Sequence, residues 1–201
     1  MAKAGPNLWI VLAAVLAGGL GLLAGYVFET RPAWLLNSET GQAVLQTAVN
    51  AGTSVPDDLQ VVGRGDPLPD IRLGNLDGSL EPIADSAGRP LLINFWASWC
   101  GPCIKEMPVL DAFAREQGIN GVQVIGIALD DIDNVKAFLA DTPVSYRLLL
   151  DVASARDSSV QLGNQRGVLP YSVLVGRDGV IRRIRLGPFA KGEVETWATA
   201  D

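Results

Sequence analysis

The chain has 201 residues, of which 48% are hydrophobic and 19% are charged, and its formal net charge is −6. A chain of this length is typical of one domain with room for an appended segment. No cluster of lysine and arginine of the kind that binds nucleic acid stands out, so we expect no nucleic-acid partner. The acidic balance indicates solubility and identifies no partner.

The N-terminal part of the chain carries a long apolar run. Residues 8–28 contain no charged side chain, and at ~1.5 Å per residue they span about 31 Å, enough to cross a hydrocarbon core of about 30 Å. Trp9 and Tyr26 lie near the two ends, where aromatic side chains favour the membrane interface. The alternative is a cleaved signal peptide, whose apolar region is shorter and is followed by small residues at a cleavage site. We therefore predict that residues 1–28 form a short tail and an uncleaved transmembrane anchor.

The segment after the anchor has the composition of a connector. Residues 29–62 are predicted to form a juxtamembrane linker, with one short helix over residues 42–50 and a flexible stretch over residues 51–58. Lys3 and the free amine precede the apolar run, and a basic tail favours an N-terminus inside the cell with the rest of the chain outside.

Residues 63–201 carry the pattern of an α/β domain. Residues 91–96 form an apolar run typical of a strand buried on both faces, and residues 122–129 form a second one. Turn residues at 75–78 and 176–179 predict two hairpins. The spacing of apolar residues and the positions of turn and capping residues predict the remaining elements. The predicted helices are 103–117, 133–141 (with Asp133 as cap), 154–162 and 193–200. The predicted strands are 147–150, 171–175 and 180–186. The order predicts a central mixed sheet flanked by helices, with parallel strands first and an antiparallel pair later.

The only two cysteines, Cys100 and Cys103, lie where the first buried strand gives way to a predicted helix. Structural zinc needs about four ligands, and the chain has no other cysteine and no histidine. Covalent haem attachment needs a histidine directly after the second cysteine, where Ile104 stands. A purely structural disulfide would close a very small loop, which constrains the unfolded chain least. Thiol–disulfide exchange is the chemistry that remains, and no cofactor is expected beyond a redox-active Cys100–Cys103 disulfide.

The position of each cysteine in the turn predicts its role. Cys100 is expected at the mouth of the helix, where unpaired backbone N–H groups and the positive end of the helix dipole lower the pKa of a thiol. Cys103 follows one turn later and is more shielded. We predict that Cys100 attacks a partner's disulfide and that Cys103 resolves the mixed disulfide. Pro102 suits the first helical turn because it has no N–H group; together with Gly101 and an exposed Trp99 it is expected to contact the substrate.

The sequence Cys-Gly-Pro-Cys after Asn-Phe-Trp-Ala-Ser-Trp resembles the thioredoxin superfamily. More narrowly, it resembles the membrane-anchored disulfide reductases of the TlpA, ResA and CcmG type, which face the bacterial periplasm. The likeness covers about residues 63–201, with further matching pieces in the same order at 67–70, 88–96, 105–108 and 167–170. It implies a thioredoxin-like α/β fold with an N-terminal transmembrane helix in the inner membrane and the catalytic domain in the periplasm.

The resemblance also implies roles for residues away from the cysteines. Pro170 falls where the superfamily has a cis proline facing the cysteines, and the backbone of its neighbour Leu169 is expected to pair with the substrate. Glu106, one turn after Cys103, is expected to be a buried acid that exchanges a proton as Cys103 reacts. The alternative for Glu106 is a first-turn carboxylate that complements the helix dipole. Thioredoxin has a buried aspartate at the place of Asn94, and asparagine cannot relay a proton.

The Gly-Pro dipeptide between the cysteines and the family favour a reductase. Its expected substrates are protein disulfides, for example those of apocytochrome c before haem attachment or of a copper-site protein, and its electrons would come from a transmembrane donor of the DsbD or CcdA kind. Three alternatives stay open. They are an oxidant with the same residues, a peroxiredoxin-like peroxidase, which Ala97 disfavours because threonine is usual there, and a metallochaperone that holds copper(I) by two thiolates.

Overall fold

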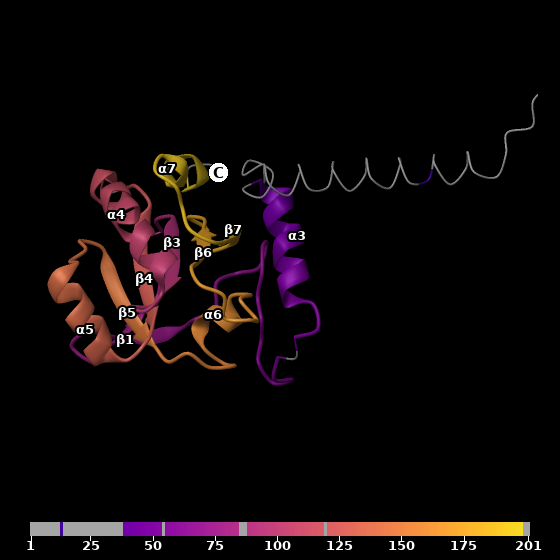
Figure 1. Cartoon of the computed structure of the whole chain (residues 1–201), viewed down its shortest axis with the longest axis horizontal. Coiled ribbons are helices and arrows are strands. Elements are labelled where there is room, and N and C mark those ends of the chain that lie inside the picture. Colours follow the sequence, from indigo (N-terminus) through magenta and orange to yellow (C-terminus); the bar gives the residue numbers. More distant parts are fainter. Residues whose placement is uncertain (1–12, 14–37, 54, 85–87, 119, 199–201) are drawn as a thin grey trace, which may run out of the picture.

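A seven-stranded mixed sheet organises the computed structural model, which describes residues 13, 38–53, 55–84, 88–118 and 120–198 (Figure 1). The strands lie in the order β2-β1-β5-β4-β3-β6-β7. Their bounds are β1 Arg72–Asn75, β2 Leu80–Pro82, β3 Leu91–Trp96, β4 Gln123–Leu129, β5 Arg147–Asp151, β6 Tyr171–Val175 and β7 Ile181–Leu186. The helices are α3 Glu39–Asn50, α4 Gly101–Glu116, α5 Ile132–Asp141, α6 Ser158–Gln161 and α7 Glu193–Ala198.

The three central strands β3, β4 and β5 are parallel, and the outer pairs are antiparallel. This arrangement confirms the predicted mixed sheet, with parallel strands first and the β6–β7 hairpin later. Every residue of β3 is buried, because helices cover both faces of the sheet. Leu92 and Trp96 point to the core beneath α4, α5 and α7, which we call the first core. Ile93 and Phe95 point to the core on the other face of the sheet, which we call the second core.

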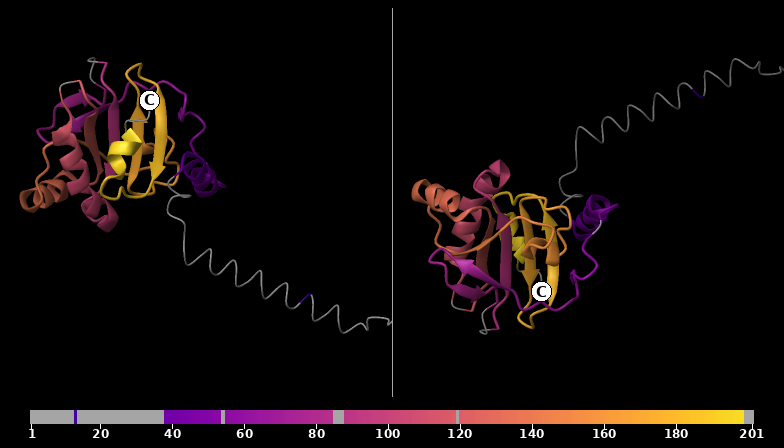
Figure 2. Two further views of the ribbon diagram at one scale, coloured as in Figure 1. Left: turned by 90° about the horizontal axis from the view of Figure 1, so that it is seen from above. Right: turned by 90° about the horizontal axis from the view of Figure 1, so that it is seen from below.

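Helix α3 lies on the opposite side of the molecule from α4 and α5 (Figure 1). Ser38 caps it by accepting the N–H of Gly41, so the helix begins earlier than the predicted residue 42. Leu45 and Val49 pack against the second core, and α3 runs beside the edge of the sheet formed by β7, as Figure 2 shows. The boundary between linker and domain at residue 63 stays a prediction, but this part of the linker packs on the domain.

The starts of helices α5 and α6 also differ from the prediction. Helix α5 begins at Ile132, and its N-cap is Asp131 and not Asp133, which lies in the first turn. Helix α6 is limited to four residues, because the Asp157 side chain accepts the N–H groups of Ser159 and Val160 and fixes the helix start there. The predicted start at residue 154 was therefore wrong. The end of the predicted last helix, at residues 199–200, lies outside the described part of the chain.

The predicted anchor over residues 8–28 also lies outside the described residues, apart from residue 13. Among the residues that the structure does describe, no helix is both long and apolar enough to cross a membrane. The anchor therefore stays a prediction from the sequence.

Gly126 in β4 gives a test of the packing between the sheet and the first core. A Cβ atom at this position would lie 2.7 Å from Leu148 Cδ2, 2.9 Å from Tyr146 Cε2 and 3.1 Å from Trp96 Nε1. Gly126→Ala is therefore expected to lower the free energy of unfolding by about 1–3 kcal/mol, because well-packed side chains must move to admit the methyl group. Urea unfolding measures this change. Gly74→Ala in β1 is the control, since nothing lies within 4 Å of its added Cβ; an equal loss in both variants would contradict the packing argument.

Candidate active site

The two cysteines lie at the turn from β3 into α4 and are joined by a disulfide bond. Cys100 is the N-cap residue of α4 with extended backbone, and its Sγ accepts the N–H of Cys103 at 3.3 Å. The S–S distance is 2.00 Å and the two Cα atoms lie 5.3 Å apart. Cys100 keeps 5% of its surface exposed, whereas Cys103 is fully buried. This difference supports Cys100 as the attacking sulfur, an assignment that stays a prediction.

A carboxylate just after the end of β4 holds the loop that leads into Cys100. The backbone N–H and the hydroxyl of Ser98 both donate to Asp130 Oδ2, at 2.9 and 2.6 Å. Burial opposes the charge of Asp130, but hydrogen bonds from Ser98, Asn134 and Asp131 outweigh it and lower the pKa of this carboxyl. This contact was not predicted from the sequence. The sequence did show that Ser98 and Asp130 each follow the C-terminal end of a predicted buried strand. Because those strands, β3 and β4, are parallel neighbours, the two residues meet at the same edge of the sheet.

The residues predicted to contact the substrate divide into two groups around the disulfide. Trp99 is 69% exposed and lines a groove of about 280 Å³ together with the half-buried Leu169. Gly101 and Pro102 are exposed at the start of α4 and do not line this groove. Pro170 is buried, and the Leu169–Pro170 peptide bond is cis, as the resemblance implies. The groove therefore combines apolar side chains with the exposed indole ring of the residue that precedes Cys100.

Glu106 is buried in the second turn of α4, on the same helix as Cys103. Its Oε1 accepts the side-chain amide N–H of Asn94 at 2.9 Å, and its Oε2 accepts the backbone N–H of Phe189 at 2.8 Å. Burial raises the pKa of Glu106 from 4.5 to about 7, although these two hydrogen bonds and the charge of Arg185 act in the opposite direction. The alternative of a first-turn carboxylate near the helix dipole is wrong, because the side chain is enclosed and lies beyond the first turn.

Residues from three other elements hold the Glu106 carboxyl in place. The Asn94 amide also donates to Ser172 Oγ at 3.1 Å, and these two residues are partners in the β3–β6 pair. Arg185 is buried, pairs with Glu193 at 2.9 Å and lies 4.5 Å from the centre of the Phe189 ring. A lone asparagine in an apolar strand was a sequence signal for this network. No local signal identified Phe189 or Arg185.

Within the described ranges, no group of three or more His, Cys, Asp or Glu side chains could hold a metal ion. The cysteine pair alone offers two sulfur ligands.

Comparison with known proteins identifies the family. Residues 64–200 match the Redoxin family. The chain is 30% identical to the thiol-disulfide oxidoreductase ResA of Bacillus anthracis over 139 residues, which are 69% of this chain and 78% of that protein. It is 27% identical to the thioredoxin-like protein YneN of Bacillus subtilis over 139 residues, covering 67% of this chain and 78% of that protein. A Chlorobium tepidum structure, provisionally described as a thiol:disulfide interchange protein DsbE, superposes with a TM-score of 0.58 at 26% identity over 66% of this chain and 93% of that one.

The chain therefore belongs to the Redoxin family and has the thioredoxin-like fold. Within that family it is a thiol–disulfide oxidoreductase of the ResA and CcmG type, with a close cysteine pair. The predicted resemblance and the predicted enzyme class are both confirmed.

The raised pKa of Glu106 predicts a particular dependence of stability on pH. Between pH 4.5 and about 7 the folded protein keeps a proton on Glu106 that the unfolded chain has released. Stability is therefore expected to fall as pH rises through this window, by up to about 3 kcal/mol at 1.36 kcal/mol per pKa unit. Glu106→Gln removes this contribution because an amide does not titrate. Urea unfolding of the oxidised protein at a series of pH values measures it.

The control for this measurement is Glu116→Gln, an exposed carboxylate at the end of the same helix. It is expected to keep the pH dependence of the wild type. If Glu106→Gln also keeps that dependence, Glu106 does not hold a proton near neutral pH.

Proposed function

We propose that this protein is a membrane-anchored reductase of protein disulfides whose site faces the periplasm. The observation that carries the proposal is the disulfide at the start of α4, in which the sulfur of the less buried cysteine already accepts a helical N–H group. A sulfur in this position is stabilised as a thiolate when the bond is reduced, because an unpaired backbone donor and the helix dipole both favour negative charge. The attachment to the membrane rests on residues 8–28 of the sequence.

The proposed reaction passes two electrons from the reduced pair to the partner. The Cys100 thiolate attacks one sulfur of the partner's disulfide, that bond breaks, and the partner's other sulfur leaves as a thiolate that takes up a proton. Cys103 then loses its proton and attacks Cys100 Sγ, which releases the second partner sulfur as a thiol. The protein ends with the Cys100–Cys103 disulfide seen in the structure.

Glu106 is the proposed proton acceptor for Cys103. It lies one helical turn after Cys103 on the buried side of α4, and its pKa of about 7 suits proton transfer near neutral pH. Its two hydrogen bonds, from Asn94 and Phe189, fix the carboxyl in one orientation. The carboxylate takes the proton as Cys103 attacks and returns it to solvent afterwards.

The proposed substrates are disulfides of unfolded or flexible protein segments. The groove beside Trp99 is open and lined largely by small and apolar side chains, which fits an extended peptide better than a small polar molecule. Cysteines of apocytochrome c before haem attachment, or of a copper-site protein, are the proposed class, with electrons supplied by a membrane dithiol donor of the DsbD or CcdA kind. Gly101, Pro102 and the Leu169 backbone are proposed to contact the same peptide.

The direction of electron flow is tested by the reduction potential of the Cys100–Cys103 pair, measured by equilibrium with a thiol buffer. A reductase is expected to have a potential near that of thioredoxin, about −270 mV. A value near about −120 mV, typical of a strong oxidant, would reverse the direction proposed here.

The exchange mechanism is tested by trapping the partner. Cys103→Ser removes the resolving thiol, so a mixed disulfide between Cys100 and the partner is expected to accumulate in native membranes. Non-reducing gels followed by mass spectrometry detect it. The double variant Cys100→Ser/Cys103→Ser is the control and should form no adduct. Absence of any adduct with Cys103→Ser would remove the main support for exchange through Cys100.

A further inference from the structure

The loop of residues 163–169, between α6 and β6, separates two hollows of the surface. On one side lies the groove of about 280 Å³ beside Trp99, and on the other lies a pocket of about 410 Å³ between α3 and β7. Gln165 lines both, and Arg166, Gly167 and Leu169 line the groove. The position of this loop therefore sets the width of the groove proposed to receive the substrate.

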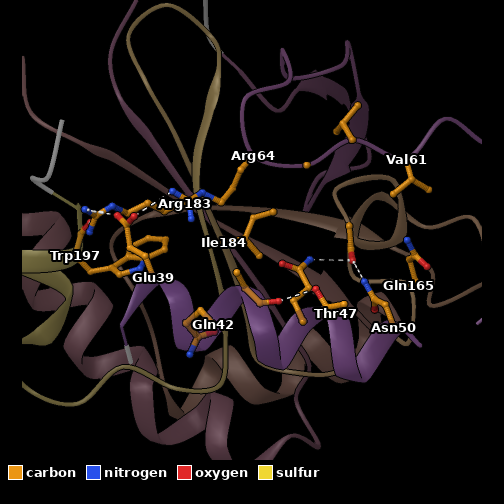
Figure 3. Close-up of a pocket in the computed structure, with 15 residues that line it drawn as sticks. Glu39, Gln42, Thr47, Asn50, Val61, Arg64, Gln165, Arg183, Ile184 and Trp197 are labelled. Carbon is orange, nitrogen blue, oxygen red and sulfur yellow. Dashed lines mark hydrogen bonds and ion pairs between the residues drawn. The ribbon is translucent and has the colours of Figure 1, made fainter. Parts of the chain in front are cut away.

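Helix α3 binds the first residue of this loop through two side-chain amides. Gln46 Nε2 donates to the carbonyl oxygen of Gly163 and to the hydroxyl of Tyr171, each at 3.1 Å. Asn50 Nδ2 donates to the same Gly163 oxygen at 3.0 Å. Figure 3 shows Asn50 at the end of α3, close to Gln165 of the loop. The carbonyl of Gly163 thus accepts two donors from a helix more than a hundred residues earlier in the chain.

Gly163 is adapted to this close approach. Its φ is +99°, a conformation that glycine adopts readily and other residues rarely do. A Cβ atom here would lie 3.0 Å from both Gln46 Nε2 and the Tyr171 hydroxyl, and 3.3 Å from the carbonyl oxygen of Val62. Backbone conformation and available space therefore both favour glycine where the loop meets α3.

The turn after α3 holds the middle of the loop. Arg166 donates to the carbonyl oxygen of Ala51 at 2.8 Å and to Thr53 Oγ1 at 3.0 Å. Within the loop, the Asn164 side chain donates to the Val168 carbonyl at 3.0 Å and accepts the Val168 N–H at 2.9 Å. This internal bridge makes the loop one unit, so its attachment at Gly163 also fixes Val168 and the adjoining Leu169.

We propose that Gln46 and Asn50 are positioning residues for disulfide exchange: they hold loop 163–169 where it forms one wall of the substrate groove. They act through the loop, without contact to either cysteine. Helix α3 precedes the region matched to the Redoxin family, which begins at residue 64. The inference rests on the proposed function, because it assigns the groove to a protein substrate.

The test compares a peptide substrate with a small disulfide that does not need the groove. The full-length protein is reduced with dithiothreitol and freed of it by gel filtration, so that the Cys100 and Cys103 thiols are the only reductant. A single turnover is then followed with an excess of a synthetic peptide that has an intramolecular Cys-x-x-Cys-His disulfide, or with dithiobis(nitrobenzoic acid). In this assay KM is the peptide concentration that gives half the maximal rate, and kcat is that maximal rate. Gln46→Met and Asn50→Leu each remove amide donors without adding charge. Each is expected to raise KM for the peptide about fivefold, which corresponds to about 1 kcal/mol, with kcat within about twofold of wild type. The rate with the small disulfide and the reduction potential should stay unchanged.

A second measurement reads the loop directly. Amide hydrogen exchange of residues 163–169 is expected to be faster in Gln46→Met and Asn50→Leu than in the wild type, with unchanged exchange in β3 and α4. Val44→Ala, at a 64% exposed position on the outer side of α3, is the matched control and should leave KM and loop exchange unchanged.

The outcomes separate this inference from the proposed function. If the wild type reduces the peptide and both variants match it in KM and loop exchange, the positioning role is overturned and the reductase assignment stands. If the variants lose activity equally toward the peptide and the small disulfide, α3 has a general structural role and the positioning role is again overturned. If the wild type does not reduce the peptide, both the proposed substrate class and this inference fail.

Discussion

The start of α4 at Cys100 is the constraint on which the rest of the site depends. Strand β3 is buried between β4, which runs parallel to it, and β6, which runs antiparallel. Its end is therefore fixed in space, and the turn that follows has little conformational freedom. The hydrogen bond from Ser98 to Asp130 ties that turn to the loop directly after β4. The helix therefore begins with a sulfur in the position of a capping group, where backbone donors meet it. A cysteine elsewhere on the helix would lack this interaction.

The same helix carries a carboxyl group into the core, which sets the electrostatics below the disulfide. Glu106 is enclosed, and its two hydrogen bonds satisfy the carboxyl without restoring the solvation that it loses on folding. The pKa of Glu106 therefore rises even though Phe189, Asn94 and Arg185 all favour the charged form. Arg185 donates to the carbonyl oxygens of Gly187 and Pro188, and Glu193 accepts the N–H of Ala190, so the two side chains hold the backbone on both sides of Phe189. The pKa of Glu106 thus depends in part on the connection between β7 and α7, which is far from the cysteines in the sequence.

The N-terminal side of the groove depends on a different set of contacts. Helix α3 lies over the outer strand β7, and the Gln42 amide pairs with both backbone groups of Leu186, as a neighbouring strand would. The edge of the sheet is covered there, and the loop before the cis proline gains support from outside the Redoxin domain. Helix α3 and the loop that lines the groove beside Trp99 are in this way parts of one packed unit.

The sequence alone determined the features that depend on local spacing. Apolar runs predicted the buried strands, and the two cysteines with no histidine predicted exchange chemistry, because these conclusions need only neighbouring residues. The tertiary structure decided the contacts that join distant segments. Phe189 meets Glu106, Asp130 meets Ser98 and Gln46 meets Tyr171 only once strand order and register are set. The Asp157 cap sets the start of the short helix α6. The sequence did not reveal this start, because several other residues before it can also begin a helix or form a turn. Local periodicity encodes which face of an element is buried, whereas the partner across that face depends on how the whole chain packs.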